Sequence, residues 1–425
     1  MGGGTGSPDE AALVELLAGT VAVPSPAGGE RAVAEWIGGW LATRHPEVDC
    51  TVDRFAPGRA NVVCRVGEAD AGDLVLYSHL DTSLSGDPAL DRPAVPAATS
   101  SGFERRGDLV SGPGVAVAKG PAAAATVGFL AAVRALAASG RRPRATLLLA
   151  AGGTHRATPP GVRLPAGSPG AGAGDGVRRF LAGGRPAAAV VAKAGPAGIL
   201  WEEPGAAYVT VEVAGPPGLV MTRSTLPGGG VPGAVGAAVA AVERWRRRFL
   251  DRPVPGGGQA GREVGVGALA AGLPYKADVV GGLLQLHLYA VLAPGDDPAA
   301  LPAELEAAVD DALARDGWTG LQVQAHLVDG LRAAATPPSA PVVRLAEAVY
   351  REAFGPPPTI AGWTGSTDGV LFRHAGVDTA RLGPTPLPGR VGTESLSLSD
   401  LVAWSRAYAR LVVRHSWATG PGVGP

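Results

Sequence analysis

The segment Leu74-Val75-Leu76-Tyr77-Ser78-His79-Leu80-Asp81 decides the fold, because an apolar run of strand length meets a histidine and an aspartate at its end. Such a run indicates a strand buried on both faces of a helix-covered sheet. Side chains at the carboxyl end of a strand like this project into the crevice where α/β proteins hold their ligands. We therefore expect a site at His79 and Asp81, although this spacing alone also fits a structural histidine.

Helical and extended segments alternate around this strand, which predicts crossover units on a mixed sheet flanked by helices. The expected helices of the first part are 10–18, 30–41, 116–138 and 175–182, and the expected strands are 61–66, 74–78, 145–150 and 187–192. The same alternation returns after Pro337 with a helix over 340–354, a loop over 359–369, a strand over 379–382 and a helix over 398–414.

The segment between these two parts has a different pattern of strands and helices. Half-exposed strands (208–213, 283–291, 321–327 and a further one near 263–269) alternate with helices over 233–249 and 302–314. This order is typical of a small ferredoxin-like α+β domain. We therefore predict a catalytic-type domain formed by residues 1–203 and 334–425, with residues 204–333 inserted as a lid domain.

Composition limits the partners of the chain. At 425 residues, with 37 Lys and Arg against 38 Asp and Glu, the formal net charge is −1, which favours a small-molecule partner over nucleic acid or an anionic membrane. Gly, Pro or charge interrupts each apolar run before membrane-spanning length, and the start shows no export signal, so a cytoplasmic location is expected. Cys50 and Cys64 lie on strands that we expect to be neighbours, and we expect two buried thiols rather than a disulfide.

Several segments resemble, in order and spacing, the dizinc family of acetylornithine deacetylase, succinyl-diaminopimelate desuccinylase and glutamate carboxypeptidase. Tyr77–Thr82 resembles the family segment GHxDxV, and the resemblance spans essentially the whole chain. The further matching segments are 112–120 (family GRGxxDxKG), 364–369 (family GGTDA) and 383–394 (family GPxxxxxHxxxE). The resemblance implies a zinc-exopeptidase-like mixed sheet, an inserted lid that forms a homodimer, and two zinc ions held by five residues.

Most of the metal ligands that the resemblance implies are replaced in this chain. His79 stands at the first ligand position, and Asp81 at the position of the residue that orients it. The other positions carry Val117, the carboxylate-free stretch 151–155, Lys193 and Arg390, and the lid histidine position carries Leu219. A co-catalytic zinc pair needs carboxylate or imidazole donors around each ion. We therefore expect no cofactor, with a residual zinc site at His79, joined by His155, as the alternative.

Cationic side chains suggest a substitute for the metal. If Lys119, Lys193 and Arg390 line the site, their positive potential would hold a substrate carboxylate or a developing oxyanion. The expected catalytic residues are Lys193, Arg390, Lys119, Asp81 and Glu394, and the expected substrate-binding residues are Thr364, Ser366, Thr367, Asp368 and His155. The alternative for the cations is a structural network with nearby carboxylates, and Glu202-Glu203 is expected to be a solvated pair at the hinge between the domains.

Three functions fit these observations. The first is a metal-independent hydrolase or acyl-transfer enzyme acting on an amide bond of a small carboxylate-bearing substrate. The second is a catalytically inactive homologue that binds a small molecule in the retained cleft. The third is a zinc-dependent amidohydrolase with non-standard ligands.

Overall fold

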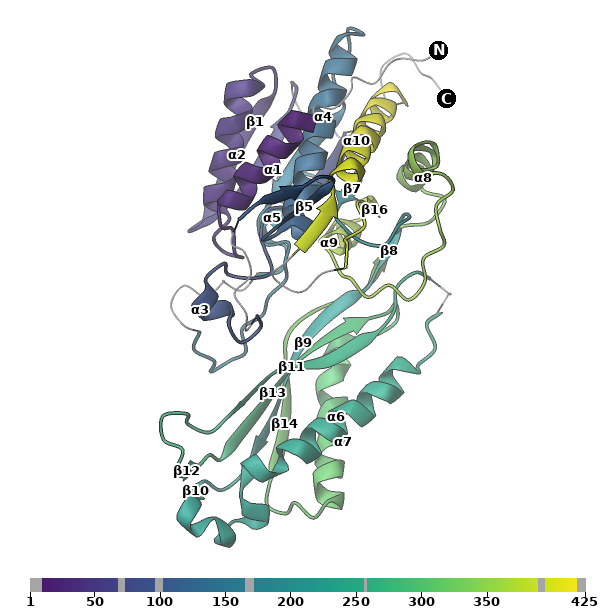
Figure 1. The fold of residues 1–425 in the computed structure, drawn as a ribbon. Coiled ribbons are helices and arrows are strands. Elements are labelled where there is room, and N and C mark those ends of the chain that lie inside the picture. Colours follow the sequence, from purple (N-terminus) through teal and green to yellow (C-terminus); the bar gives the residue numbers. More distant parts are fainter. Residues whose placement is uncertain are drawn as a thin grey trace.

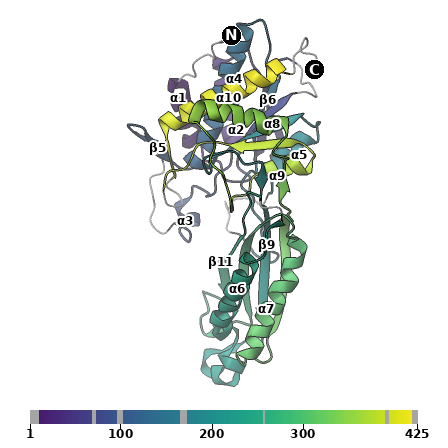
Figure 2. The ribbon, with the colours of Figure 1, turned by 90° about the vertical axis from the view of Figure 1, so that its right-hand side faces the viewer.

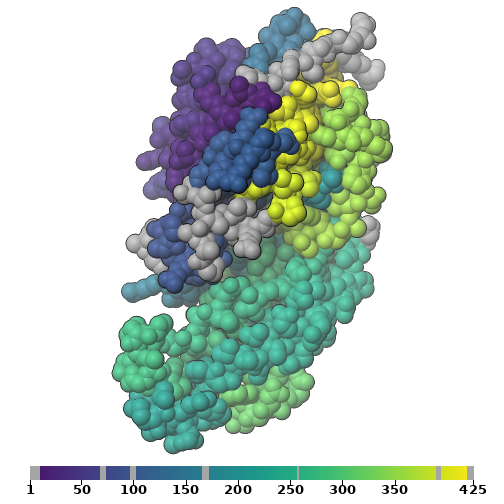
Figure 3. Space-filling model, in the orientation of Figure 1, coloured from purple at the N-terminus to yellow at the C-terminus, as the bar shows by residue number. Residues whose placement is uncertain are grey.

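A computed structural model defines the protein over residues 10–67, 73–95, 102–164, 172–255, 258–388 and 394–418. Over these residues the chain forms two domains, which Figures 1 and 3 show one below the other. The first and last parts of the chain together build the upper, catalytic-type domain, and the middle part builds the lower, lid domain.

The catalytic-type domain is built on a six-stranded mixed sheet in the order β1-β2-β6-β3-β7-β16. Its strands are β1 (Asp49–Ala56), β2 (Arg59–Arg65), β3 (Leu74–His79), β6 (Ala145–Ala150), β7 (Ala188–Ala192) and β16 (Asp378–Leu382). β6, β3, β7 and β16 run parallel to one another. β1 is antiparallel to β2, and β2 is antiparallel to β6. β3, β6 and β7 are buried along their whole length, which explains why their sequences are mostly apolar.

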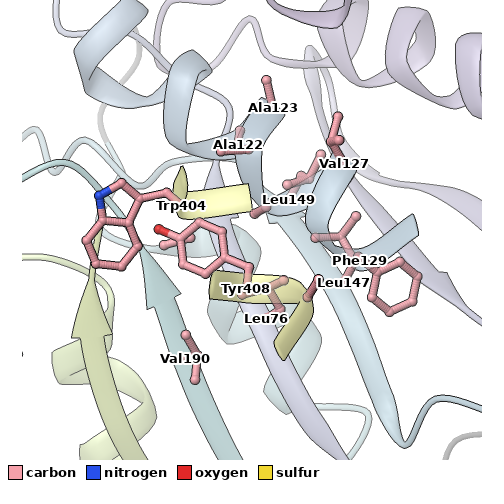
Figure 4. Packing of buried hydrophobic residues seen from close by; sticks show 14 of the residues in the cluster. Leu76, Ala122, Ala123, Val127, Phe129, Leu147, Leu149, Val190, Trp404 and Tyr408 are labelled. Atoms are coloured by element: carbon pink, nitrogen blue, oxygen red, sulfur yellow. The ribbon is translucent and has the colours of Figure 1, made fainter. Parts of the chain in front are cut away.

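Helices cover both faces of this sheet. One face packs against α1 (Glu10–Ala22), α2 (Arg31–Arg44), α4 (Gly120–Ala137), α8 (Pro341–Phe354) and α10 (Leu398–Ala418), and the other packs against α5 (Asp175–Leu181) and α9 (Gly369–His374). Phe129 of α4 and Tyr408 of α10 meet Leu76 and Leu149 of the sheet in the larger core (Figure 4). The segment Val115–Ala137 has the length and apolarity of a membrane span, but it is 94% buried as the central helix of this core.

Short elements complete this domain. They are α3 (Pro88–Asp91), the three-stranded sheet of β4 (Glu104–Arg106), β5 (Leu109–Gly112) and β17 (Glu394–Ser397), and the π-helical turn η1 (Val115–Lys119) before α4. Two short strands, β8 (Glu202–Glu203) and β15 (Ala334–Ala335), pair where the chain leaves for the lid domain and returns from it.

The lid domain is an antiparallel sheet with two helices on one face, and it extends away from the catalytic-type domain (Figure 2). The sheet has the order β11-β13-β9-β14, with β9 (Gly205–Ala214), β11 (Glu263–Ala271), β13 (Leu283–Leu292) and β14 (Gln322–Leu331). The helices are α6 (Val235–Leu250) and α7 (Leu301–Arg315), and the short strands β10 (Gly218–Leu219) and β12 (Val279–Val280) pair at the far tip. Alternate residues of β9 and β13 enter the core under the helices, which leaves the other face of the sheet open.

The architecture confirms the expected mixed sheet flanked by helices, but the expectation for the cysteines was wrong. Cys50 and Cys64 are direct partners across the β1–β2 pair, with their Cα atoms 4.1 Å apart, and they form a disulfide. The alternating apolar pattern does not reveal which residues of two paired strands stand opposite each other, so the register of β1 and β2 could not be predicted. Disulfides persist mainly in oxidising compartments. The cytoplasmic location therefore stays a prediction, and this disulfide argues against it.

The interpretation of Glu202-Glu203 as a solvated pair was also wrong, because both side chains are buried. Glu203 accepts hydrogen bonds from the guanidinium of Arg373 and the hydroxyl of Thr367. Glu202 accepts a hydrogen bond from the amide of Ala260, 2.8 Å away. The pair thus fixes the connection between the two domains, where burial without such partners would be costly.

Candidate functional site

The parallel strands of the central sheet end side by side and place the residues that follow them along one edge. β6, β3, β7 and β16 are neighbours in that order, and β3 ends at His79. Because parallel strands share their carboxyl edge, the segments after β6 and β7 lie near His79. A cavity of about 560 Å³ opens between this edge and the lid domain, and residues of both domains line it.

His79 and Asp81 form a buried pair behind this cavity. The Nδ1 atom of His79 lies 3.2 Å from Oδ1 of Asp81, and both residues are at most 1% exposed. Burial alone would raise the pKa of Asp81, but the attraction of His79 and hydrogen bonds from Thr154 outweigh it and hold the pKa well below its ordinary value. Asp81 is therefore ionised and orients the His79 ring.

Two buried carboxyl groups hold the turn that follows β6. Oε1 of Glu30 accepts from the amide of Gly152 (3.1 Å), while Oδ1 and Oδ2 of Asp81 accept from the amides of Gly153 (2.7 Å) and Thr154 (2.6 Å). Three consecutive backbone amides are thus fixed, and His155 follows them directly. Burial raises the pKa of Glu30 to about 7. Sequence reasoning missed Glu30, because a glutamate before a helix is normally an exposed residue.

His155 and Asp368, which the sequence assigned separately to substrate binding, form a direct pair. Nε2 of His155 lies 2.6 Å from Oδ1 of Asp368, and the hydroxyl of Tyr77 donates to the other carboxylate oxygen. Asp368 is buried at the start of α9, whereas His155 lines the cavity. The hydroxyl of Tyr208 in the lid donates to the carbonyl oxygen of His155, 2.5 Å away. An imidazole oriented by a carboxylate is the arrangement of a general base.

Lys193 and Arg381 place positive charge at this edge of the sheet. Lys193 follows β7, lines the cavity, and makes no hydrogen bond or ion pair with any described residue. Burial and the neighbouring Arg381 lower the pKa of Lys193. Arg381 is 2% exposed, donates through Nη2 to the carbonyl of Ala194 (2.6 Å), and stacks 4.9 Å from the ring centre of Trp363.

Arg381 was missed in the sequence, although one signal for it existed. It lies within β16 between the buried apolar residues Ala380 and Leu382, and a charge at a buried strand position needs a partner or a function. Its Nε and Nη1 atoms are buried and have no partner among the described residues. Burial lowers the pKa of its guanidinium to about 10, so the group stays charged at neutral pH.

Two of the expected catalytic residues hold backbone segments in this structure. Nζ of Lys119 donates to the carbonyls of Thr20 (2.7 Å) and Val23 (2.9 Å), and it is not among the residues that line the cavity. Burial lowers the pKa of Lys119 to about 8. Glu394 accepts from the amides of Ala116 (2.9 Å) and Val117 (2.7 Å) at the turn before α4. Both therefore fix the chain around η1.

The remaining expected residues lie on the loop before α9 or beyond the described part of the chain. Thr364 is exposed, and Ser366 lines the cavity. Thr367 is buried, and its hydroxyl bonds to Glu203 and accepts from the amide of Gly369 (3.1 Å). Arg390 lies outside the described residues.

The side chains at this edge do not fit a zinc pair. Within the described ranges, no group of three or more His, Cys, Asp and Glu residues is arranged to hold a metal ion. His79 offers a buried Nε2 atom without a described partner, but Asp81 already uses both oxygens on backbone amides. Structural and catalytic zinc sites need at least three protein donors. The charges of Lys193 and Arg381 further oppose a bound cation.

Comparison with known proteins identifies the fold. No protein-family model matches the sequence, and no curated protein matches it. Solved structures do match over nearly the whole chain, and they define an M20-type peptidase fold, as the resemblance of the motifs implied.

Three of these structures show the extent of the likeness. A tripeptidase from Staphylococcus aureus has a TM-score of 0.65 at 14% identity, covering 97% of this chain and 100% of its own. Human carnosine dipeptidase 1 has a TM-score of 0.67 at 11% identity, covering 96% of both chains. A dinuclear metal-binding peptidase of the M20 family from Bacillus subtilis has a TM-score of 0.59 at 12% identity, covering 96% of this chain and 98% of its own. At such identities the likeness establishes the fold alone.

Proposed function

We propose that this protein is a metal-independent hydrolase that acts on an amide bond of a small carboxylate-bearing substrate. The observation that carries the proposal is the His155–Asp368 pair, 2.6 Å apart, in a cavity that also contains the unpaired Lys193. The proteins that share the fold include a tripeptidase and a dipeptidase, whose names describe cleavage of amide bonds. The B. subtilis structure that shares the fold is described as a dinuclear metal-binding peptidase, whereas the cavity of this chain offers a base and a positive charge.

The chemistry assigns the base to His155. In this proposal the carboxylate of Asp368 accepts a hydrogen bond from Nε2–H of His155, so the lone pair of the ring lies on Nδ1. Nδ1 has no hydrogen-bond partner among the described residues and takes a proton from water as the water oxygen bonds to the amide carbon. The carbon–nitrogen bond then breaks, and the same proton passes to the leaving amine. Water and amide thereby give a carboxylic acid and an amine.

Lys193 and Arg381 supply the electrostatic part of the site. Their two positive charges lie at one edge of a partly enclosed cavity, where solvent screens them less than at the surface. They attract the substrate carboxylate to this edge and orient the amide toward His155. Arg390, which the resemblance suggested as a further cation, lies outside the described residues.

A second candidate function is a binding protein without catalysis, and a specific observation favours it. Lys119 and Glu394, which the sequence assigned to chemistry, are both engaged with backbone groups. A chain that has lost its metal donors could have retained only the cleft and its positive edge. A zinc-dependent amidohydrolase with non-standard ligands is the third candidate. It is disfavoured because, among the described residues, His79 is not part of a group of three or more His, Cys, Asp and Glu side chains that could hold a metal ion.

The decisive experiment is turnover by chelator-treated protein against N-acylglycines and dipeptides, compared with His155→Asn and with His326→Asn. His326 is an exposed histidine of β14 that is not among the cavity residues, so its variant is the matched control. Turnover that survives chelation and His326→Asn but is lost in His155→Asn supports the proposal. Binding without turnover supports the second candidate. Two zinc ions per chain, with activity that only zinc restores, would establish the third.

A further inference from the structure

The carboxylate of Glu203 joins the junction of the two domains to the first turn of α9. Glu203 belongs to β8, which lies where the chain enters the lid domain (Figure 1), and it is 0% exposed. One carboxylate oxygen accepts from the hydroxyl of Thr367, and the other accepts from the guanidinium of Arg373. A Cβ atom at Gly369 would overlap this carboxylate, so only glycine fits there without a shift of Glu203. A buried anion thus packs directly against the start of a helix.

Thr367 uses its hydroxyl both as a donor and as an acceptor. It donates to Glu203 and accepts from the amide of Gly369, 3.1 Å away. That amide belongs to the first turn of α9, where backbone donors have no partner within the helix. Thr367 therefore serves this donor in place of Asp368, whose side chain makes no capping bond to α9. The carboxylate of Asp368 is left for other partners.

The other partners of Asp368 are His155 and Tyr77. Oδ1 of Asp368 lies 2.6 Å from Nε2 of His155, and the hydroxyl of Tyr77 donates to Oδ2. Both oxygens are therefore engaged, in a residue that is 1% exposed. Because Thr367 directly precedes Asp368, any shift of the Thr367 backbone is passed to the carboxylate that orients the ring. The contacts that begin at β8 thus end at the proposed base.

Arg373 anchors Glu203 to the rest of the catalytic-type domain. Its Nη2 atom donates to the carbonyl of Thr379 in β16 (2.9 Å), and its Nε atom donates to the hydroxyl of Thr336 after β15 (3.2 Å). Each of its three nitrogen atoms therefore has a described acceptor. Hydrogen bonds between two charged groups are among the strongest in proteins. Glu203 is thus held at a fixed position behind α9.

We propose that Glu203 and Thr367 are positioning residues that orient His155 through Asp368. The inference rests on the proposed hydrolysis, in which His155 is the base, and it extends that reaction to two residues that do not line the cavity. A reacting group displaced by about 1 Å can cost on the order of 100-fold in rate. Hydrogen bonds behind Asp368 therefore affect the chemistry without contacting the substrate.

The test removes the hydroxyl of Thr367 and observes His155 by NMR in protein that contains isotope-labelled histidine. Thr367→Val removes the donor and the acceptor with little change of shape, and Thr367→Ser keeps both. The unmodified protein and Thr367→Ser should show the Nε2-protonated tautomer of His155, with a slowly exchanging Nε2 proton. Thr367→Val should show a mixture of tautomers and faster exchange of that proton. The His155→Asn protein identifies the signals.

Steady-state kinetics give the second readout. Thr367→Val should lower kcat at least about tenfold and change KM less than about twofold, because the base is displaced and the cavity lining is not. Thr367→Ser should restore kcat. Thr126→Val is the matched control, since it removes a buried hydroxyl that donates to the carbonyl of Ala122 (2.8 Å) in α4, on the other face of the sheet. It should leave kcat and the His155 signals unchanged.

Two further variants keep the test independent of the folding of one protein. Thr367→Ala removes the hydroxyl without placing a methyl group against the carboxylate, and Glu203→Gln keeps the shape of the side chain and removes its charge. Both should reproduce the effects of Thr367→Val in protein whose circular dichroism matches that of the unmodified chain. An unchanged His155 tautomer in the folded variants would overturn the inference, and so would an equal change in Thr126→Val.

The two proposals fail in different ways. If Thr367→Val changes the tautomer of His155 but the unmodified protein hydrolyses no amide, the hydrolase proposal falls and the positioning role stands. If hydrolysis is lost in His155→Asn, but the tautomer and kcat both survive in Thr367→Val, the hydrolase stands and the positioning role falls.

Discussion

The hydroxyl of Tyr208 donates a hydrogen bond of 2.5 Å to the carbonyl oxygen of His155. Tyr208 belongs to the lid sheet, and His155 follows β6 of the catalytic-type domain, so this bond ties the lid to the turn that carries the proposed base. The same turn is fixed from behind by Glu30 and Asp81. His155 is thus positioned from both domains, which is the kind of support that a precisely oriented base requires.

The bond between the domains gives the first prediction. Tyr208→Phe keeps the ring and removes the donor, leaving the His155 carbonyl without this partner. We expect the free energy of unfolding to fall by about 1 kcal/mol, the usual net value of one hydrogen bond. We also expect kcat to fall more than KM rises, since the orientation of His155 is affected. Urea unfolding measures the change in stability, steady-state kinetics measure kcat and KM, and Tyr275→Phe is the control. An unchanged kcat would show that the bond does not position the base.

The buried carboxyl of Glu30 predicts a pH dependence of stability. Its pKa is raised from 4.5 to about 7 on folding, so its protonated form is the one that the fold favours. The stability that it contributes is therefore complete below about pH 4.5 and is lost as the pH rises to about 7. The full change is on the order of 3 kcal/mol, from about 1.4 kcal/mol per pKa unit.

Glu30→Gln imitates the protonated form and should abolish this slope while keeping an oxygen for Gly28 and Gly152. Urea unfolding between pH 5 and pH 8 measures this slope, and Glu243→Gln on the lid helix α6, where the side chain is 46% exposed, serves as the control. If the slopes of Glu30→Gln and the unmodified protein coincide, Glu30 does not titrate in this range.

The lysines allow a direct test of the environment of Lys193. Burial and Arg381 lower its pKa, so the reactive neutral amine appears at a lower pH than the ordinary value of about 10.4. Pulse labelling with acetic anhydride from pH 6 to pH 11, read by peptide mass spectrometry, should give a midpoint below that value. Lys276, which is ion-paired with Asp278 on the lid, reports the response of the reagent in the same sample. A Lys193 midpoint at or above that of Lys276 would contradict the lowered pKa.

The disulfide predicts a loss of stability on reduction. Cys50 and Cys64 close a loop with a sequence separation of 14, for which chain entropy gives about 3 kcal/mol. Dithiothreitol should lower the free energy of unfolding by up to this amount, and the Cys50→Ser/Cys64→Ser double variant should be insensitive to it. Denatured, unreduced protein should bind no iodoacetamide. Labelling at both cysteines would show that the pair is reduced in the isolated protein.

We also propose that the protein is a homodimer through the lid domain. β14 is an edge strand of the lid sheet, and the lid exposes large apolar residues, among them Met221 (73% exposed) and Leu219 (42%). Apolar side chains exposed in this way often mark a protein interface. Light scattering at micromolar concentration should give about twice the 42.4 kDa of one chain. Met221→Glu should shift the measured mass toward that of the monomer, and a monomeric unmodified protein would refute the proposal.

The sequence by itself determined the main features of the fold. The mostly apolar runs of β3, β6 and β7 predict strands that helices cover on both faces, and the change of pattern after Pro204 predicts the lid domain. The resemblance of its motifs also implied that Val117 and Lys193 stand where the resembling family has metal-binding carboxylates, and this stays a prediction. These features are local, because burial and side-chain chemistry repeat along a strand or occupy one position of a motif.

Only the tertiary structure decided which groups work together. His155 and Asp368 are separated by 213 positions, and Glu30 reaches Gly152 across 122. The disulfide likewise depended on the register of β1 and β2. The role of Arg381 could be inferred only from the structure, which places Trp363 and Lys193 next to its guanidinium. Such pairings follow from how separate strand ends and loops pack against one another, and no periodicity along the chain encodes those distances.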